Sequence, residues 1–165
     1  MSVTILLIPV ALAAASLAGG TGLTAAFRAK NDAGAGDGPA TAVSVRTRMK
    51  DRGLLGLALE DLGAVDVSVG AAEVSAVVDD HRLTMTLTDD DVWEAHFERT
   101  DGLAVDEGIA GDILTRLDGA YAGRVQSAVA ARIRAQADSA GFELVSETRD
   151  DDATVTMVLN VRQDA

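Results

Sequence analysis

Apolar and polar residues alternate in short runs through most of the chain after residue 41, with the two-residue period of strands that bury one face. The runs that alternate or are rich in β-forming residues are Ala42–Arg48, Val65–Val69, Glu73–Val78, Leu83–Leu87, Val92–Glu98, Phe142–Glu147 and 155–161. In the fifth run Trp93, Ala95 and Phe97 fall on one face. The pattern therefore predicts seven strands and places Trp93 and Phe97 in the core.

A first helix is predicted between the first two strands, where apolar residues are spaced by three and four. These residues are Leu54, Leu55, Ala58, Leu59 and Leu62. Asp51 precedes them and can cap the first turn with its carboxylate. Gly63 follows them and supplies the stop, since glycine readily adopts the left-handed conformation that ends helices.

A second, longer helix is predicted over Asp106–Ala140, with Gly141 as its stop. Its apolar residues recur every four positions: Ile109, Ile113, Leu117, Tyr121, Val125, Val129 and Ile133. Each step of four advances an ideal helix by about 40°, so six steps carry the stripe about 240° around the axis. One face cannot bury such a stripe, so we expect a bend or break near Gly119 or Gly123.

Short runs of aspartate separate several of these elements and are typical of turns, because the carboxylate bonds to its own backbone. They are Asp79-Asp80, Asp89-Asp90-Asp91 and Asp150-Asp151-Asp152. The predicted order is β-α-β-β-β-β-α-β-β, with the second helix long or broken. This order indicates an α+β fold in which an antiparallel sheet is covered by helices, preceded by one N-terminal transmembrane helix.

That transmembrane helix is inferred from Val3–Phe27, 25 residues without a formal charge, which is long enough to span a bilayer. Arg28 and Lys30 follow it directly, so the positive-inside rule places the rest of the chain in the cytoplasm. We therefore predict a membrane anchor over residues 1–28. The alternative is a cleaved secretory signal with a small-residue site at Ser16-Leu17-Ala18, followed by secretion.

Residues 29–40 read AKNDAGAGDGPA, a composition that favours a flexible linker. Gly34, Gly36 and Gly38 do not have the spacing of a dinucleotide loop, and no strand precedes them, so no cofactor is expected. Residues 41–165 then form one acidic α+β domain. The chain has no cysteine, which excludes disulfides and thiolate chemistry.

The charge of the chain restricts its partners. Acidic residues number 26 against 14 basic ones, for a net charge of −12. Residues 1–40 are neutral overall, because Arg28 and Lys30 balance Asp32 and Asp37, so the whole excess lies in residues 41–165. Such a surface disfavours nucleic acid and favours cations or a basic protein patch.

The candidate metal ligands are Glu94, His96 and Glu98, which alternate along one predicted strand and therefore share a face. An imidazole between two carboxylates could hold a divalent cation. The alternative is an ordinary solvent-facing strand of the same composition. His81, beside Asp79-Asp80, is interpreted as a polar neighbour of a turn. No catalytic residues are predicted, because no Gly-x-Ser-x-Gly motif is present.

The chain resembles the domain of unknown function 1257 family, conserved hypothetical proteins of cyanobacteria and algal plastids, over residues 42–162. The residues that carry the likeness are the opening strand and turn 43–51, the helix end Ala58–Gly63, Trp93, Phe97, Tyr121, and Ala140-Gly141-Phe142 with the closing hairpin. The apolar leader departs from the family pattern. The resemblance implies the fold and the role of an accessory assembly protein, often encoded near AAA-type ATPases, and it implies no activity.

Taken together, the sequence predicts a membrane-tethered protein-interaction or assembly module. Residues 3–27 would contact the bilayer, and the acidic domain would bind an AAA-type ATPase or another protein with a basic surface. Two alternatives stay open. One is a binding module that responds to divalent cations through Glu94, His96 and Glu98, and the other is an enzyme with an unrecognised site.

Overall fold

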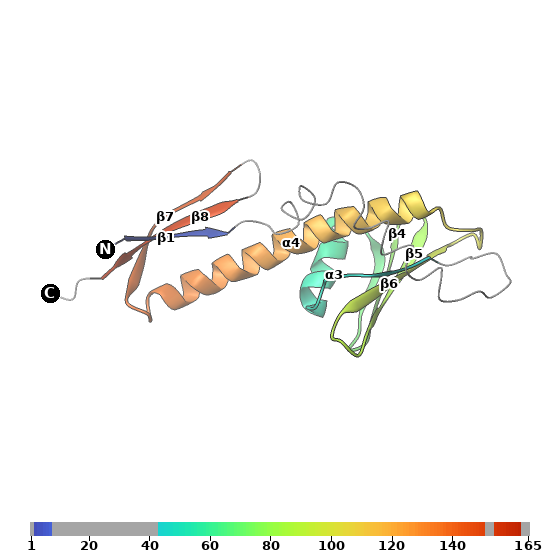
Figure 1. The fold of residues 1–165 in the computed structure, drawn as a ribbon, viewed down its shortest axis with the longest axis horizontal. Helices are drawn as coiled ribbons and strands as arrows, with labels where there is room; N and C mark the ends of the chain where they lie inside the picture. The colour runs from blue at the N-terminus through green and yellow to red at the C-terminus, as the bar shows by residue number, and fades with distance from the viewer. Residues whose placement is uncertain (1, 8–42, 151–153, 163–165) are drawn as a thin grey trace. The chain divides into compact units, whose positions relative to one another are not determined.

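The computed structural model describes residues 2–7, 43–150 and 154–162, which form an α+β structure with two helices and two antiparallel sheets (Figure 1). The elements are β1 (Ser2–Leu7), β2 (Val43–Arg46), α3 (Arg52–Asp61), β3 (Val65–Val69), β4 (Glu73–Val78), β5 (His81–Leu87), β6 (Trp93–Arg99), α4 (Glu107–Ala137), β7 (Phe142–Arg149) and β8 (Val155–Val161). From β2 onward, this is the order predicted from the sequence.

The prediction of a single sheet was wrong, because the strands form two sheets. One contains five strands in the order β2-β6-β5-β4-β3, and the other contains three in the order β1-β8-β7. The described residues also divide into two compact units. The larger unit comprises 43–121, and the smaller one comprises 2–7, 122–150 and 154–162.

The larger unit buries one face of its five-stranded sheet beneath α3 and the first half of α4. Trp93 and Phe97 project from β6 into this core, with 1% and 0% of their surface exposed, as predicted. Leu55 and Leu59 of α3 and Leu117 of α4 pack in the same cluster. Burial of such large apolar side chains is the main favourable term in folding this unit.

The ends of α3 follow the predicted capping chemistry. The Asp51 carboxylate accepts a hydrogen bond of 2.9 Å from the backbone N–H of Leu54. At the other end Gly63 has a φ of +76°, in the left-handed region where a side chain would be strained. The Tyr121 hydroxyl of α4 accepts from the N–H groups of Lys50 and Asp51, at 3.1 and 3.0 Å, and ties the start of α3 to α4.

The β4–β5 hairpin turns through Asp79 and Asp80, as predicted. Val78 pairs with His81 across the turn, and both aspartates have positive φ, at 48° and 62°. A two-residue loop with positive φ at both positions matches the right-handed twist of the flanking strands, and aspartate tolerates that conformation. The turn at Asp89–Asp91 is likewise present, with Asp91 at a φ of 57°.

The smaller unit packs its three strands against the second half of α4. Ala130, Val155 and Met157 are buried together, with Ile5, Leu7, Ile133 and Leu144 around them. Arg134 of α4 forms a bidentate ion pair with Glu147 of β7. This pair lowers the pKa of the Glu147 carboxyl below its ordinary value, because the guanidinium hydrogen bonds stabilise the charged form.

The rotating stripe of α4 is explained by two cores. Ile113 and Leu117 pack in the core of the larger unit, whereas Ala130 and Ile133 pack in that of the smaller one. The helix runs unbroken from Glu107 to Ala137, so the predicted break near Gly119 or Gly123 is absent. The division between the units falls after Tyr121, between these two glycines. A stripe that drifts around the helix can therefore be buried without one continuous face, and Ile109 and Val129 lie exposed.

The predicted transmembrane helix over residues 3–27 begins in a segment that the structure shows as a strand. Ser2–Leu7 pairs antiparallel with β8, from Ser2 opposite Asn160 to Leu7 opposite Val155. Residues 8–27, the remainder of the predicted span, and the linker 29–40 lie outside the described residues. None of the helices in the described part of the chain is both long enough and apolar enough to cross a bilayer.

Candidate functional site

The polar face of the five-stranded sheet, opposite the core of the larger unit, carries the residues singled out from the sequence. Alternation along β6 places Glu94, His96 and Glu98 on this face, as predicted, with Trp93 and Phe97 on the other. The strand register extends the row of His96 across the sheet. This row runs Ser44, His96, Thr84, Ser75 and Ser68.

Both ring nitrogens of His96 are held by hydroxyl groups from the two neighbouring strands. Nδ1 lies 2.6 Å from Ser44 Oγ on β2, and Nε2 lies 3.1 Å from Thr86 Oγ1 on β5. Ser44 Oγ also donates to Glu94 Oε1 at 3.3 Å. When Ser44 donates to the carboxylate it accepts from Nδ1–H, so Thr86 donates to Nε2 in the neutral ring. The chain of bonds fixes the orientation of the imidazole.

The same geometry accommodates a charged imidazole. If Nε2 gains a proton, the Thr86 hydroxyl can rotate and accept from it, because a hydroxyl is both donor and acceptor. The Nδ1–H bond to Ser44 and the Ser44 bond to Glu94 are unchanged. The site can thus hold His96 in either protonation state with both ring nitrogens hydrogen-bonded.

The two glutamates face arginines on adjacent strands. Arg46 of β2 lies opposite Glu94, and Arg82 of β5 lies opposite Glu98. Among the described residues no group of three or more His, Asp or Glu is placed to hold a metal ion. A cation at Glu94, His96 and Glu98 would have to displace Ser44 or Thr86 from the imidazole. The metal site stays a prediction.

The pairing of Ser44 with His96 does not form a catalytic triad. In such a triad the carboxylate bonds the imidazole nitrogen that faces away from the serine and raises its basicity. Here the second nitrogen bonds Thr86, and Glu94 bonds the serine itself. The arrangement therefore orients hydroxyls for hydrogen bonding and does not activate one as a nucleophile.

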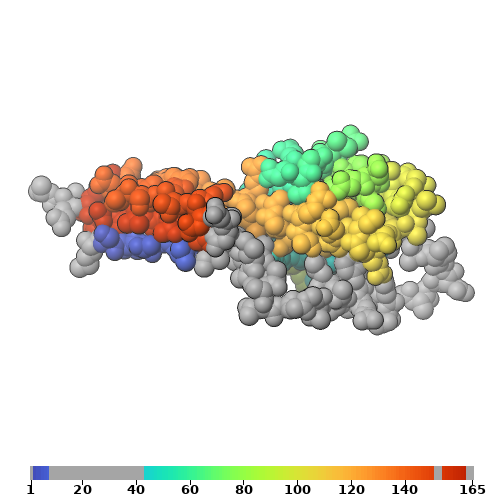
Figure 2. Space-filling view, turned by 90° about the horizontal axis from the view of Figure 1, so that it is seen from above, coloured from blue at the N-terminus to red at the C-terminus, as the bar shows by residue number. Residues whose placement is uncertain are grey.

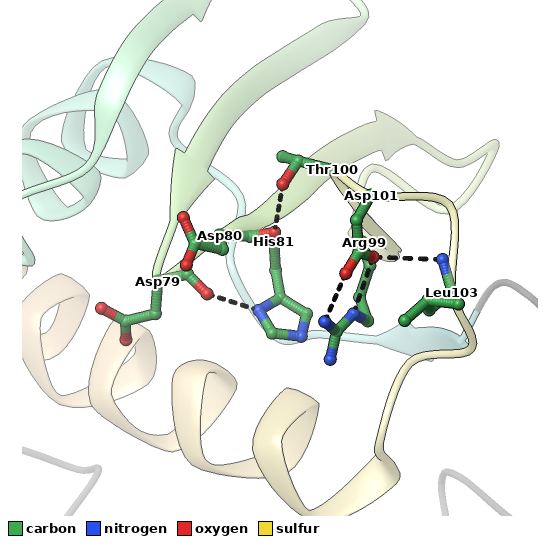
Figure 3. A network of polar contacts seen from close by, with 7 residues as sticks. All are labelled: Asp79, Asp80, His81, Arg99, Thr100, Asp101 and Leu103. Carbon is green, nitrogen blue, oxygen red and sulfur yellow. Dashed lines mark hydrogen bonds and ion pairs between the residues drawn. The ribbon is translucent and has the colours of Figure 1, made fainter.

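A second polar group, at the β4–β5 turn, centres on His81, which the sequence suggested only as a polar neighbour of the turn (Figure 3). His81 is 5% exposed, and its Nδ1 lies 2.6 Å from the carbonyl oxygen of Asp79. A carbonyl only accepts, so Nδ1 carries the proton. Nε2 is buried without a hydrogen-bond partner among the described residues. The only sequence signal was its place at the start of a strand, in phase with Leu83 and Met85.

The turn is tied to its neighbours by further polar contacts (Figure 3). Thr100 donates to the Asp80 carbonyl oxygen from both its N–H and its hydroxyl, at 3.1 and 3.0 Å. Arg99 donates to both Asp101 oxygens, and the Leu103 N–H donates a third bond at 3.1 Å. These bonds, that from Arg99 foremost, lower the pKa of Asp101 to about 2.

A shallow depression of about 490 Å³ lies beside the start of α3. Lys50 and Arg52 line it with Asp51, and Val69, Ala71 and Leu87 form an apolar side. The Asp51 carboxylate already caps the Leu54 N–H at this helix end. An anion there would meet the aspartate as well as the two cations, so the depression is poorly suited to phosphate.

The excess of acid is concentrated in the larger unit. Residues 43–121 contain 17 acidic and 7 basic residues, for a net charge of −10, whereas residues 122–165 contain 7 and 5, for −2. Arg46, Arg48, Arg99 and Arg116 in the larger unit pair with Asp90, Asp118, Asp101 and Asp79 respectively. Four of its seven cations are therefore already engaged with acids of the same unit.

Comparison with known proteins finds no family model, no curated protein and no solved structure that matches this chain. The resemblance to the domain of unknown function 1257 family consequently rests on the residues quoted for it and stays a prediction.

Proposed function

We propose that this protein is a protein-interaction or assembly module that binds a basic surface of a partner protein through the polar face of its larger unit. Glu94, His96 and Glu98 would lie at the centre of the contact, flanked by the hydroxyls of Ser44 and Thr86. No covalent chemistry is required of the site. The observation that carries the proposal is the chain of hydrogen bonds that holds His96 between two strands.

That chain of bonds favours binding because it orders the side chains before a partner arrives. Immobilising a side chain at an interface costs about 0.5–1.5 kcal/mol, so a surface that is already ordered loses less free energy on association. Hydroxyl and carboxylate groups also accept hydrogen bonds from lysine and arginine. A partner of this kind would find its acceptors in fixed positions.

The charge of the larger unit supports a basic partner. A net charge of −10 within 79 residues attracts cations over about a Debye length, and oppositely charged surfaces steer encounter. Phosphate-bearing partners would be repelled by the same field. The resemblance adds an AAA-type ATPase as a candidate partner, provided that it presents a basic surface.

Tethering to a membrane by residues 3–27 is a further part of the proposal. It requires β1 to separate from β8, for the following reason. A single-pass span after Leu7 would put Ser2–Leu7 on the opposite side of the bilayer from β8. The β1–β8 pairing and such a span therefore exclude each other. We propose that the strand leaves β8 when the leader inserts and that the rest of the chain then faces the cytoplasm.

Affinity capture with the full chain from native membranes tests the proposed function. Proteins retained at low ionic strength should carry basic surfaces, and they should be released when salt shortens the Debye length to about 3 Å near 1 M. A capture that is insensitive to salt, or that retains only acidic proteins, contradicts the proposed mode of binding.

A further inference from the structure

Three of the four sheet edges described have features that discourage pairing with another chain. The edge strand β2 has only four residues. β3 is interrupted between Val65 and Ser68, where Asp66 has a positive φ. β7 has a bulge between Leu144 and Ser146 and carries Glu143, Glu147 and Arg149. Short length, bulges and charges are the usual devices that protect an edge.

The fourth edge, β1, has none of these features. Its six residues, Ser2–Leu7, pair with β8 in unbroken register and include no charged side chain. Val3 and Leu6 are 44% and 55% exposed. Figure 2 shows this strand, in blue, along the rim of the red surface formed by β7 and β8. A regular, apolar and uncharged edge is a template for a further strand.

We infer that β1 is a self-association site at which the β1 strands of two copies of this chain pair antiparallel and join their three-stranded sheets into one of six strands. Such a contact is isologous, since the same residues face each other across a two-fold axis. The inference goes beyond the proposed docking of a basic partner and does not depend on it. It applies to the chain whose β1 is paired with β8, and not to the membrane-inserted form.

The side-chain pattern of β1 is compatible with this symmetry. Val3, Ile5 and Leu7 lie opposite Leu159, Met157 and Val155 on the face that packs on α4. A two-fold axis perpendicular to the sheet, midway between the two β1 strands and level with Thr4 or Ile5, keeps these side chains of both copies on one face. The apolar layer then continues from one copy to the next, and no like charges meet along the seam.

Charge favours a second copy at this edge over a basic partner. The chain has a net charge of −12, but residues 122–165 carry only −2 of it, and β1 carries none. Electrostatic repulsion between two copies is therefore weakest at the smaller unit, where β1 of the second copy would pair with β1. The larger unit, at −10, is the part that repels its own copies.

Thr4→Lys in the full chain tests the inference, with Ser146→Lys as its matched control. Thr4, Val158 and Ser146 form one cross-strand row, so the two substitutions place the same side chain on the same face at opposite edges. Both positions are exposed. Hydrogen exchange of β8 should be unchanged in both variants, which verifies that β1 still pairs with β8.

Sedimentation of the full chain in aqueous buffer should reveal a dimer. Thr4→Lys should weaken the dimer by about tenfold or more, because the two lysines would lie directly opposite each other with the axis at Thr4, or diagonally across the seam with the axis at Ile5. Ser146→Lys should dissociate like the unsubstituted chain. A chain that stays monomeric, or an equal effect of the two variants, overturns the inference. A monomer that binds another protein in a Thr4-dependent way also overturns it, and assigns the edge to a foreign strand.

Discussion

Several aspartates of this chain occupy backbone conformations that few other residues adopt, in addition to giving the surface its charge. Asp66, Asp79, Asp80 and Asp91 all have positive φ, a conformation that aspartate adopts more readily than most residues. Asp79 and Asp90 also accept from arginines of distant segments. Part of the acidity of the larger unit thus follows from backbone conformations that aspartate tolerates well.

The two faces of β6 should respond very differently to truncation. Trp93→Ala should lower the free energy of unfolding by about 3–5 kcal/mol, because the ring is fully buried. His96→Ala removes two hydrogen bonds from a partly buried side chain and should cost about 1 kcal/mol. Urea denaturation of the full chain measures both. Equal losses would contradict the assignment of faces.

The Arg99–Asp101 pair should give a titration shift that can be measured directly. Because the folded-state pKa of Asp101 is depressed to about 2, the pair stabilises the fold above the ordinary carboxyl pKa. This contribution is lost as the pH falls from about 4 to about 2. Carboxyl NMR of Arg99→Gln should move the midpoint of Asp101 up toward its ordinary value. A midpoint that does not move would show that Arg99 is not the cause.

At the scale of elements, β1 is the strand whose removal is most informative. A chain that starts at Thr41 lacks Ile5 and Leu7, which pack on the core of the smaller unit. It should retain slow hydrogen exchange in β4, β5 and β6, whereas β8 should exchange faster, since it loses one of its two neighbouring strands. Unchanged protection of β8 would mean that β1 adds nothing to the sheet.

Periodicity predicted most of the elements but not how they assemble. Alternation located Trp93 and Phe97 in the core, and Asp51 and Gly63 marked the ends of α3. It could not assign β7 and β8 to a second sheet, because a strand pattern specifies a buried face and not a partner strand. The strand Ser2–Leu7 was missed because Val3 opens an uncharged run of 25 residues, and the length of that run favoured a membrane span over a strand.

Of the candidate site, only the residues on β6 could be predicted from the sequence. The alternation of Glu94, His96 and Glu98 identified their common face, and the structure agrees. Their hydrogen-bond partners, Ser44 and Thr86, lie 52 and 10 residues from His96 and reach it only through the register of β2 and β5. Nothing in the local sequence marks such partners, so the row of hydrogen-bonded side chains around His96 could be recognised only from the fold.

At the scale of the whole molecule, an engineered disulfide between β1 and β8 tests whether β1 leaves β8 when the leader enters a membrane. The chain has no cysteine, and Leu6 lies opposite Thr156 on the face away from α4. Oxidised Leu6→Cys/Thr156→Cys should be extracted from vesicles by alkaline carbonate, and the reduced form should resist extraction. Leu6→Cys/Asn160→Cys, out of register, should not cross-link. A locked chain that still integrates would contradict the proposed exclusion.

Binding to a basic partner through the polar face of the larger unit is tested most directly by two matched charge reversals. Glu98→Lys changes an exposed strand position on that face, and Glu143→Lys makes the same change on β7 of the smaller unit. For a partner captured from native membranes, the dissociation constant should rise about tenfold with Glu98→Lys and stay within about twofold with Glu143→Lys. Equal effects, or a loss of binding confined to Glu143→Lys, would contradict docking on this face.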